Sequence, residues 1–426
     1  MNAPTHHGQR TAHLDAAGTG PMPDAVRAVL ADCTARDDRF GARALDEHLA
    51  AGPGPGIRER LGRLLGVPAR DTLPVTGAAD AFDAFLARLD PGPRDRIWTT
   101  PHEGVAQLTS LHALRDRTRC RLDVVPLRPD GDLDLDWMRA HIGPDVALVS
   151  AVHVSAACGT ANPVHEIGRI LTPHRARYAV DASHSAGQLP LDAARIGCDL
   201  LTADGWRFLR GPQDTGFAYT RPGARDTSPT SPTSPGGPGA HARPAPGQPP
   251  VPAPAAVAAL NTALAHHAAA PPPLQDLLPR LRAVLERTPG VELLPAGRDR
   301  AGILAFRHHE VPAARLRRAL ARHGAVLAKT VAQEHPLHPA AAGGAPAVRA
   351  SVHRGTTAQD IDHFARALRD ALREERHTPT APAPAPAPAP AAALAAAAGG
   401  AGGRGWPSPY AGRTVRRGHL TLHSAT

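Results

Sequence analysis

The segment DGWRFLRGPQDTGFAY, residues 204–219, has the form of a loop that anchors a bound ligand, and Arg207 lies near its centre. A guanidinium stays protonated to about pH 12, so it holds an anion through paired hydrogen bonds but cannot offer a free amine for a covalent bond. For the same reason it is a poor general base. Whatever ligand this loop faces, Arg207 can hold it only noncovalently.

Three side chains capable of proton chemistry lie upstream of this loop. Asp181 and His184 belong to the motif DASHSAG, and His153 lies in VHVS. An aspartate at the end of a predicted strand is often only a turn or cap residue. Among 24 histidines, most are surface or core residues with one satisfied nitrogen, and core packing is the alternative reading for His153.

Alternating short apolar runs and helical patterns between residues 57 and 220 predict a mostly parallel sheet covered by helices, which is an α/β fold. The predicted strands are residues 146–152, 178–181, 199–203 and 216–220. Between the first two, Asn162 and Pro163 predict the N-cap and first turn of a helix. The sheet would bring the ends of these strands, and so the candidate residues, together.

The second half of the chain predicts a smaller α+β domain. Residues 256–288 are helical in pattern with PPP at 271–273 as an interruption, and strands are expected at 302–306 and 325–330 around a helix that ends at Gly324. A last helix begins with Thr357 and Asp360 as a capping box. The apolar face expected for that helix is Ile361, Phe364, Leu368 and Leu372.

Composition divides the chain of 426 residues as follows: 1–12 an N-terminal extension, 13–220 the large domain, 221–255 a Pro/Gly/Ser-rich linker or insertion, 256–290 a connecting helical region, 291–377 the small domain, and 378–426 an Ala/Pro tail with a basic end. A chain of this length and 42% apolar content can bury two cores.

Charge and cysteine usage exclude several classes of function. The net charge is +9, but the basic residues are dispersed and only the tail segment 413–419 forms a cluster, so nucleic acid is not the expected partner. The four cysteines have no CxxC spacing, so no zinc site, no other metal and no disulfide is expected. There is no apolar run of membrane-spanning length and no signal-peptide core, and a cytoplasmic location is expected.

Several segments resemble the class V aminotransferases of the fold type I pyridoxal phosphate (PLP) superfamily, which includes cysteine desulfurases and isopenicillin N epimerase-like proteins. These segments are HLDAAGTGPMPDAVRAVL, VTGAADAFDAFLARL, VALVSAVHVSAACGTANPVHEIGRI, the run from YAVDASHSAG to GFAY, and VRASVHRGTTAQDIDHFARAL. The resemblance covers about residues 13–220 and 256–374. It implies a fold type I PLP-transferase-like architecture, with PLP as cofactor and an amino-acid-like small molecule as substrate.

The resemblance also assigns roles to residues. Asp181 would face the pyridine nitrogen and keep it protonated, His184 would bond to the phenolic oxygen, and Arg349 would grip a substrate carboxylate. A solvated strand-end arginine is the alternative for Arg349. The phosphate-binding turn is Gly77, Ala78 and Ala79, and His153 lies beside the cofactor face.

The sequence departs from the family at the catalytic lysine, whose place Arg207 takes. The turn also has Ala79 where a hydroxyl is usual, and the aromatic residue that stacks on the ring would fall near Gly104. The sole lysine of the chain, Lys329, lies on a predicted strand of the small domain, where an exposed lysine is the alternative to a relocated anchor. The loop TVAQEHPLHPAAAGGAP has no cysteine to carry a persulfide, so cysteine desulfurase activity is not expected.

Three hypotheses follow from these departures. The first is a family homologue impaired or inactive in Schiff-base catalysis that acts as a binding or partner protein. The second is an enzyme that holds PLP or pyridoxamine phosphate noncovalently through Asp181, His184 and Arg207. The weakest is a nucleic-acid binder that uses the basic tail. The family resemblance implies a homodimer, and a heterodimer with an active homologue is the alternative.

Overall fold

The computed structural model describes residues 11–50, 56–223, 247–268, 274–295, 297–330, 334–338 and 346–377. All of these belong to one compact unit, residues 1–380. The tail cluster at 413–419 and most of the predicted linker lie outside the described residues.

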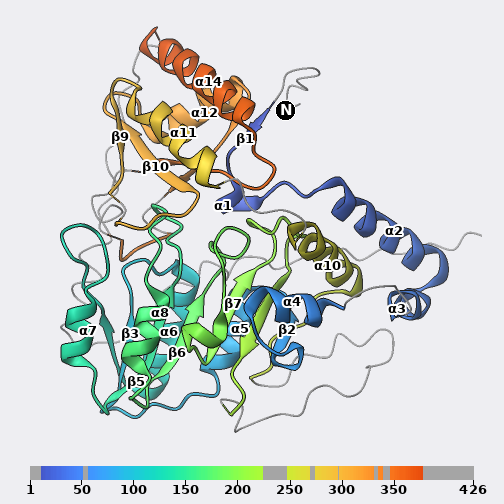
Figure 1. Ribbon diagram of the computed structural model, residues 1–426, viewed down its shortest axis with the longest axis vertical. Coiled ribbons are helices and arrows are strands. Elements are labelled where there is room, and N and C mark those ends of the chain that lie inside the picture. Colours follow the sequence, from blue (N-terminus) through green and yellow to red (C-terminus); the bar gives the residue numbers. More distant parts are fainter. Residues whose placement is uncertain are drawn as a thin grey trace, which may run out of the picture. The chain divides into compact units, whose positions relative to one another are not determined.

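A seven-stranded sheet forms the larger part of this unit (Figure 1). Its strands, in spatial order, are β2 (Thr72–Val75), β8 (Gly216–Thr220), β7 (Leu200–Asp204), β6 (Arg177–Asp181), β5 (Val146–Val152), β3 (Arg96–Thr99) and β4 (Arg121–Val124). The five strands from β7 to β4 are parallel, whereas β8 is antiparallel to both of its neighbours. The predicted mostly parallel α/β sheet is confirmed.

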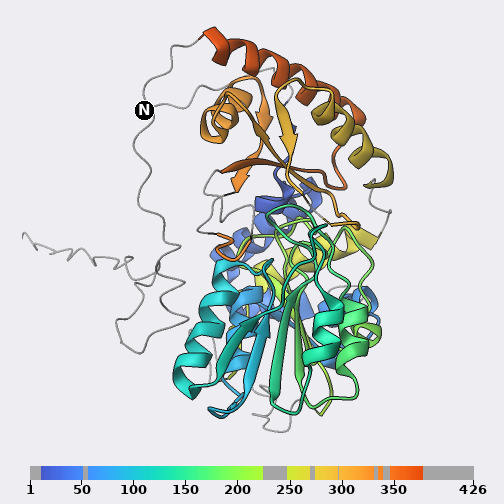
Figure 2. The same cartoon turned by 90° about the vertical axis from the view of Figure 1, so that its left-hand side faces the viewer.

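Helices cover both faces of this sheet (Figure 2). They are α4 (Ile57–Leu65), the 3-10 turn η1 (Ala69–Asp71), α5 (Ala78–Leu86), α6 (Val105–Thr118), α7 (Leu135–His141), α8 (Val164–Leu171), α9 (Ala193–Ile196) and α10 (Pro254–Ala268). Alternating strand residues explain the two layers, because successive side chains point to opposite faces. Tyr178 and Val180 of β6 pack in the core with α8, and Ala179 packs in the core with α5 and α6.

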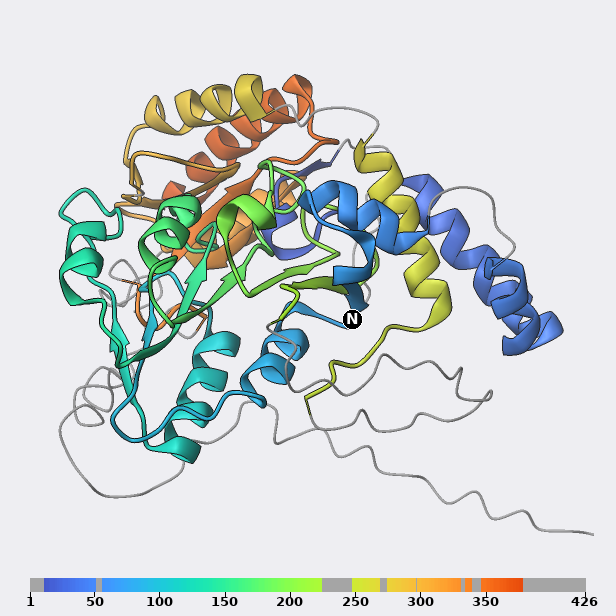
Figure 3. The ribbon, with the colours of Figure 1, turned by 60° about the horizontal axis from the view of Figure 1, so that its bottom comes forward.

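The N-terminal segment lies between the large sheet and the strands of the C-terminal region. It contains β1 (Ala12–His13), α1 (Ala16–Thr19), α2 (Asp24–Phe40) and α3 (Ala42–Ala50). Helix α10 packs along α2, where Ala259 and Ala263 meet Val26 (Figure 3). Strand β1 pairs with a strand of the C-terminal region, so the first described residues belong structurally with the last.

A four-stranded antiparallel sheet follows α11 (Leu274–Glu286). Its order is β12 (Ala328–Thr330), β13 (Ala347–Ser351), β10 (Ile303–His308) and β9 (Val291–Leu293), and α12 (Ala313–Arg322) and α14 (Ala358–His377) pack on it. The capping box is present, since the backbone N–H of Thr357 donates to Asp360 at 2.8 Å and the backbone N–H of Asp360 donates to the Thr357 hydroxyl at 3.3 Å. The four apolar residues predicted for the last helix are all buried.

Two local predictions were wrong. Residues 325–330 form two strands, because β11 (Ala325–Val326) pairs with β1 while β12 pairs with β13. Asn162 does not cap α8: the helix begins at Val164 after Pro163, without a side-chain cap, and the Asn162 side-chain amide instead donates to the carbonyl of Val152.

The helical region 256–288 is two helices, α10 and α11, and residues 271–273 lie outside the described ranges.

Candidate active site

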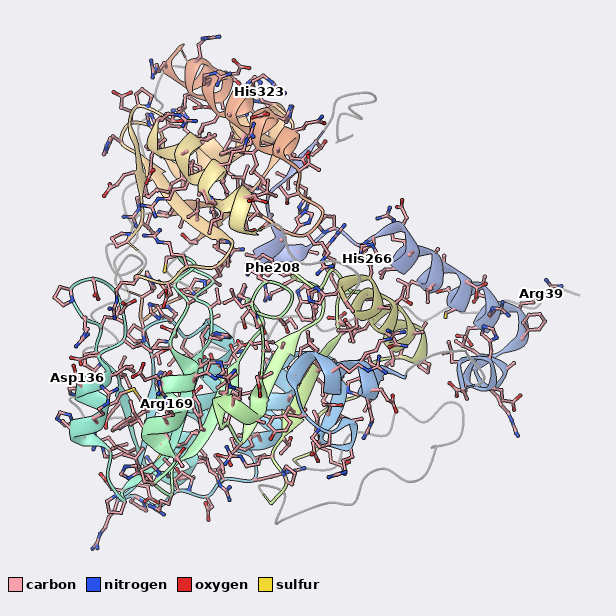
Figure 4. All side chains as sticks on the ribbon, viewed as in Figure 1. Arg39, Asp136, Arg169, Phe208, His266 and His323 are labelled. Atoms are coloured by element: carbon pink, nitrogen blue, oxygen red, sulfur yellow. The ribbon has the colours of Figure 1, made fainter. Side chains whose placement is uncertain are left out.

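Arg207 lies in the loop that follows β7, and its Nε and one terminal nitrogen donate hydrogen bonds to neighbouring protein groups. The Nε donates to Oδ2 of Asp204 at 2.9 Å, and one terminal nitrogen donates to the carbonyl of Ala17 at 2.6 Å and to that of Gly18 at 3.3 Å. The guanidinium also lies 5.7 Å from the centroid of the Trp206 ring. The residue after it, Phe208, which is labelled in Figure 4, belongs to a small apolar cluster with Ala16 and Ala17. The arginine is therefore locked between the large sheet and α1.

The side chain of Asp204, the last residue of β7, lies at the N-terminal end of helix α5. Its Oδ1 accepts the backbone N–H of Ala78 at 3.0 Å, and Ala78 is the first residue of that helix. Free N–H groups and the helix dipole make such an N-terminus a binding site for anions. The turn Gly77–Ala79, expected to receive a phosphate, thus already has an internal carboxylate on its first N–H group.

Asp181 lies at the end of β6, as predicted, and its two oxygens are both engaged. Oδ1 accepts the backbone N–H of Ser183 at 2.8 Å, and Oδ2 accepts the side-chain amide of Gln107 at 2.9 Å. Burial, and then the nearby Asp204 carboxylate, raise the pKa of Asp181 to about 6. Gln107 belongs to α6, whose N-cap is Gly104, so an amide from this helix reaches the carboxylate while the residue in the expected stacking position has no side chain.

His184 is buried and neutral at physiological pH. Its Nε2 lies 3.1 Å from the carbonyl of Ala17, the same carbonyl that accepts from Arg207, so this nitrogen carries the proton. Burial lowers the pKa of His184 well below its usual value, and the charges of Arg207 and Arg349 act in the same direction. The structure thus brings His184, Arg207 and the α1 backbone together.

Arg349, on β13, is buried with only 6% of its surface exposed. Its terminal nitrogens lie 3.2 Å from the carbonyl of Ala156 and 3.5 Å from Oδ1 of Asp15, and among the described residues its Nε has no hydrogen-bond partner. The solvated arginine considered as the alternative is therefore excluded. A buried guanidinium with a spare donor is suited to a carboxylate ligand.

His153 and Lys329 do not join this group of contacts. His153 is buried, its Nδ1 has no partner among the described residues, and burial lowers its pKa to about 4. Lys329 is exposed on β12. Ala328 pairs with Arg349, so Lys329 points to the opposite face of the small sheet from Arg349.

Sequence reasoning assigned no role to Asp204, Gln107 or Glu103. Glu103 is fully buried, accepts the hydroxyls of Thr99 (3.0 Å) and Ser150 (3.1 Å), and has its pKa raised to about 8 by burial and then by Asp181. The one available signal was the carboxylate at the end of a strand directly before the anchoring loop, which is the position of Asp204. The partners of these residues come from distant segments and needed the fold to identify them.

The comparisons with known proteins agree with the fold. The family model for Aminotransferase class-V matches residues 13–364. A probable cysteine desulfurase of Xylella fastidiosa is 29% identical over 228 residues, covering 50% of this chain and 53% of the relative. The chain thus spans about half the length of the curated relatives it matches.

Solved structures extend the likeness to most of the chain. The cysteine desulfurase CsdA of Escherichia coli superposes with a TM-score of 0.71 at 22% identity, over 85% of this chain and 95% of that one. A variant of C-DES with glycine covalently linked to its PLP cofactor superposes with a TM-score of 0.70 at 21% identity, over 84% and 96% of the two chains. The fold expectation is confirmed, and the family supports PLP as its cofactor. None of the helices in the described ranges is both long and apolar enough to cross a bilayer.

Proposed function

Because this chain belongs to the class-V aminotransferase family, we propose that it has kept the family scaffold and lost lysine-dependent catalysis, and that it acts as a binding or partner protein. One observation carries the proposal. Arg207, which the family resemblance assigns to the lysine position, forms an ion pair with Asp204, and the Asp204 carboxylate also accepts the first N–H group of α5, the helix expected to receive a phosphate.

The residues present do not fit a Schiff-base PLP site. Arg207 has no amine that can form an imine. The Asp204 carboxylate would face a phosphate of the same sign at α5, and charges of like sign a few ångströms apart repel by about 4 kcal/mol at an effective dielectric constant of 20. Asp181, the residue expected to face the pyridine nitrogen, already accepts the amide of Gln107.

Lys329 does not supply the missing amine. It is exposed and lies on the face of the small sheet opposite to Arg349. A relocated anchor would have to enter the site from that opposite face, which requires a rearrangement of β12.

The test is a titration of the purified full chain with PLP, followed by borohydride reduction and mapping of modified peptides. We expect no saturable absorbance change in the near-ultraviolet and visible range and no adduct within residues 11–377. The Lys329→Arg variant is the matched control, because it removes the chain's single lysine side chain and leaves the charge unchanged. A reduced adduct at Lys329 that disappears in this variant, together with transamination by the wild-type chain, would overturn the proposal.

The partner role has its own measurement. The family scaffold supports a dimer, and light scattering of the purified chain is expected to give twice the mass of 44.4 kDa. Co-expression with an active class V relative tests the heterodimer. A chain that stays monomeric and captures no relative would contradict the partner role while leaving the loss of catalysis standing.

A second candidate function is favoured by Arg349, whose buried Nε has no partner among the described residues. On this alternative the site holds an amino-acid-like carboxylate, with PLP or pyridoxamine phosphate bound noncovalently. Saturable cofactor absorbance without an adduct, lost in Asp181→Asn, would favour it over the first proposal. The nucleic-acid hypothesis rests on the basic tail, which lies outside the described residues.

A further inference from the structure

Three buried side chains from separate segments converge beside the large sheet. His102 lies between β3 and α6, Cys158 lies between β5 and α8, and His338 ends the described segment 334–338. Each offers one ligand atom, and the three atoms lie within 4.8 Å of one another. Cys158 Sγ is 3.3 Å from Nε2 of His338. We propose that His102, Cys158 and His338 form a zinc-binding site.

The orientation of His102 is fixed by a partner suited to a metal ligand. Its Nδ1 lies 3.0 Å from Oδ1 of Asn162, while the Nδ2 of the same amide donates to the carbonyl of Val152 at 2.7 Å. The donor at Nδ2 identifies the amide oxygen as the acceptor for His102, so the imidazole proton is on Nδ1. The Nε2 lone pair is then free, which is the arrangement that outer-sphere partners impose on zinc-bound histidines. This explains why Asn162 does not cap α8.

The sulfur ligand is a free thiol held in place. Cys158 is 2% exposed, and its Sγ lies 3.1 Å from the hydroxyl of Thr160. Gly159, between them, has φ of +85° and an ideal Cβ on it would lie 2.2 Å from the carbonyl oxygen of Ile303. Only glycine fits there, so the turn that presents the thiol is tightly constrained.

The ligand set and spacing select the metal. Two imidazoles and one thiolate are borderline-soft donors, which favour zinc over calcium or magnesium. Tetrahedral zinc places such atoms about 3.3–3.6 Å apart, given bond lengths of about 2.0–2.3 Å. The Cys158–His338 pair already has this spacing, and the other ligand atoms lie within 4.8 Å of one another. Three protein ligands leave one position for water or a ligand atom.

The expectation of no metal rested on cysteine spacing, which does not reveal this site. Cys158 and His338 are 180 positions apart in the chain, and no short motif contains both. The proposal is independent of the loss of lysine chemistry, because none of its three residues takes part in the Arg207–Asp204 contacts.

The experiment uses the full chain, stripped with a chelator and titrated with Co²⁺ under reducing conditions. Cobalt in a site with a thiolate gives a sulfur-to-cobalt charge-transfer band and strong visible ligand-field bands. We expect one Co²⁺ per chain with both features, displaced by one equivalent of Zn²⁺. Cys158→Ser should abolish the charge-transfer band, and Cys198→Ser, a buried cysteine whose sulfur lies near the Ala193 carbonyl, is the matched control that should retain it.

Two further variants keep the result decisive. His338→Gln should weaken Zn²⁺ binding by about tenfold or more even if Cys158→Ser fails to fold, and Asn162→Ala should weaken it by about 10- to 100-fold through loss of the His102 orientation. A stoichiometric cobalt complex without the charge-transfer band, or a band that persists in Cys158→Ser, would overturn the proposal. Absence of any binding by folded wild-type chain would do the same.

Discussion

Arg207 and Asp204 are three residues apart and form an ion pair of 2.9 Å inside the site, with side chains 23% and 10% exposed. In this geometry each residue compensates the other. Without the carboxylate the arginine would be a half-buried cation with no counter-charge at its Nε, and the carboxylate is also bonded to the first N–H group of α5. The Asp204 carboxylate thus joins Arg207 and the first N–H group of α5 in one set of contacts. On the proposed function, the loss of the lysine and the internal carboxylate at the turn expected to receive a phosphate belong together.

The first prediction concerns restoring the site. Arg207→Lys alone should gain little PLP binding, because Asp204 still faces the phosphate. The double variant Asp204→Ser/Arg207→Lys should bind PLP at least about tenfold more tightly than the single variant, since removal of one opposing charge is worth more than about 1.4 kcal/mol. Absorbance titration with borohydride trapping measures both.

The control for removing the Asp204 carboxylate is the removal of a carboxylate elsewhere, in the double variant Asp192→Ser/Arg207→Lys. Asp192 caps a different helix, α9, by accepting the backbone N–H of Arg195 at 2.9 Å. It should leave PLP affinity unchanged. Equal affinities for the single and double variants would show that Asp204 does not control the phosphate position.

The ion pair itself should contribute to stability. Arg207→Ala leaves Asp204 with the Ala78 N–H group and no cation, and we expect a loss of about 1–3 kcal/mol in the free energy of unfolding. Asp204→Ala in addition should cost less than the sum of the two single changes, because the two residues interact directly. Denaturant unfolding of the wild type, the two single variants and the double variant gives the coupling energy between the two side chains.

A surface pair provides the comparison. Arg36 and Asp32 on α2 are 2.7 Å apart but 40% and 56% exposed, and the same cycle there should give less than about 1 kcal/mol. Coupling energies of equal size at the two sites would mean that the Arg207–Asp204 pair is no more than a surface contact.

Asp181 predicts a pH dependence of stability. Burial and Asp204 raise its pKa in the folded chain from 3.8 to about 6, so the folded state binds this proton more tightly than the unfolded state. Its contribution is therefore fully present below about pH 4 and is lost as the pH rises through 6. The Asp181→Asn side chain does not titrate, so the stability of this variant should not fall as the pH rises. It can keep the hydrogen bonds to the Ser183 N–H group and to Gln107, provided that the Gln107 amide turns so that its oxygen accepts.

The difference in unfolding free energy, Asp181→Asn minus wild type, should thus increase by about 2–3 kcal/mol between pH 4 and pH 7. Denaturant unfolding at several pH values measures it. A constant offset for Asp181→Asn would show that its carboxyl titrates normally.

The sequence predicted the elements that hold the site better than the contacts within it. Strand β8 has the predicted bounds and β6 ends at Asp181 as expected, because apolar strand residues and turn signals are local features. The arginine at position 207 was also visible in the loop, and its assignment to the lysine position rests on the family resemblance. The contacts that could not be predicted join residues far apart in the chain. Asp204 accepts the N–H group of Ala78, 126 positions away, and Asp181 accepts the amide of Gln107, 74 positions away.

Asn162 illustrates the same limit. Its type and position before Pro163 favour a helix cap, yet the tertiary contacts with His102 and Val152 take its amide. A local preference of about 1 kcal/mol is easily outweighed by two buried hydrogen bonds. Asn162, whose predicted local role failed, instead orients His102 of the proposed metal site.

The last prediction tests how closely the Arg207 loop packs on the DASHSAG turn. Gly187 has φ of +93°, and an ideal Cβ there would lie 2.8 Å from the backbone carbon of Phe208. Gly187→Ala therefore combines a left-handed backbone with a backbone clash, and should cost more than about 2 kcal/mol. Gly197→Ala separates the two causes, because Gly197 has a left-handed conformation with φ of +75°, and the nearest atom to its Cβ position is a terminal nitrogen of Arg221 at 3.7 Å, an ordinary contact. It should cost about 1 kcal/mol, the cost of the backbone conformation alone. Unfolding in denaturant measures both, and equal losses would mean that the loop moves away from the turn without penalty, so that the position of Arg207 would not depend on this contact.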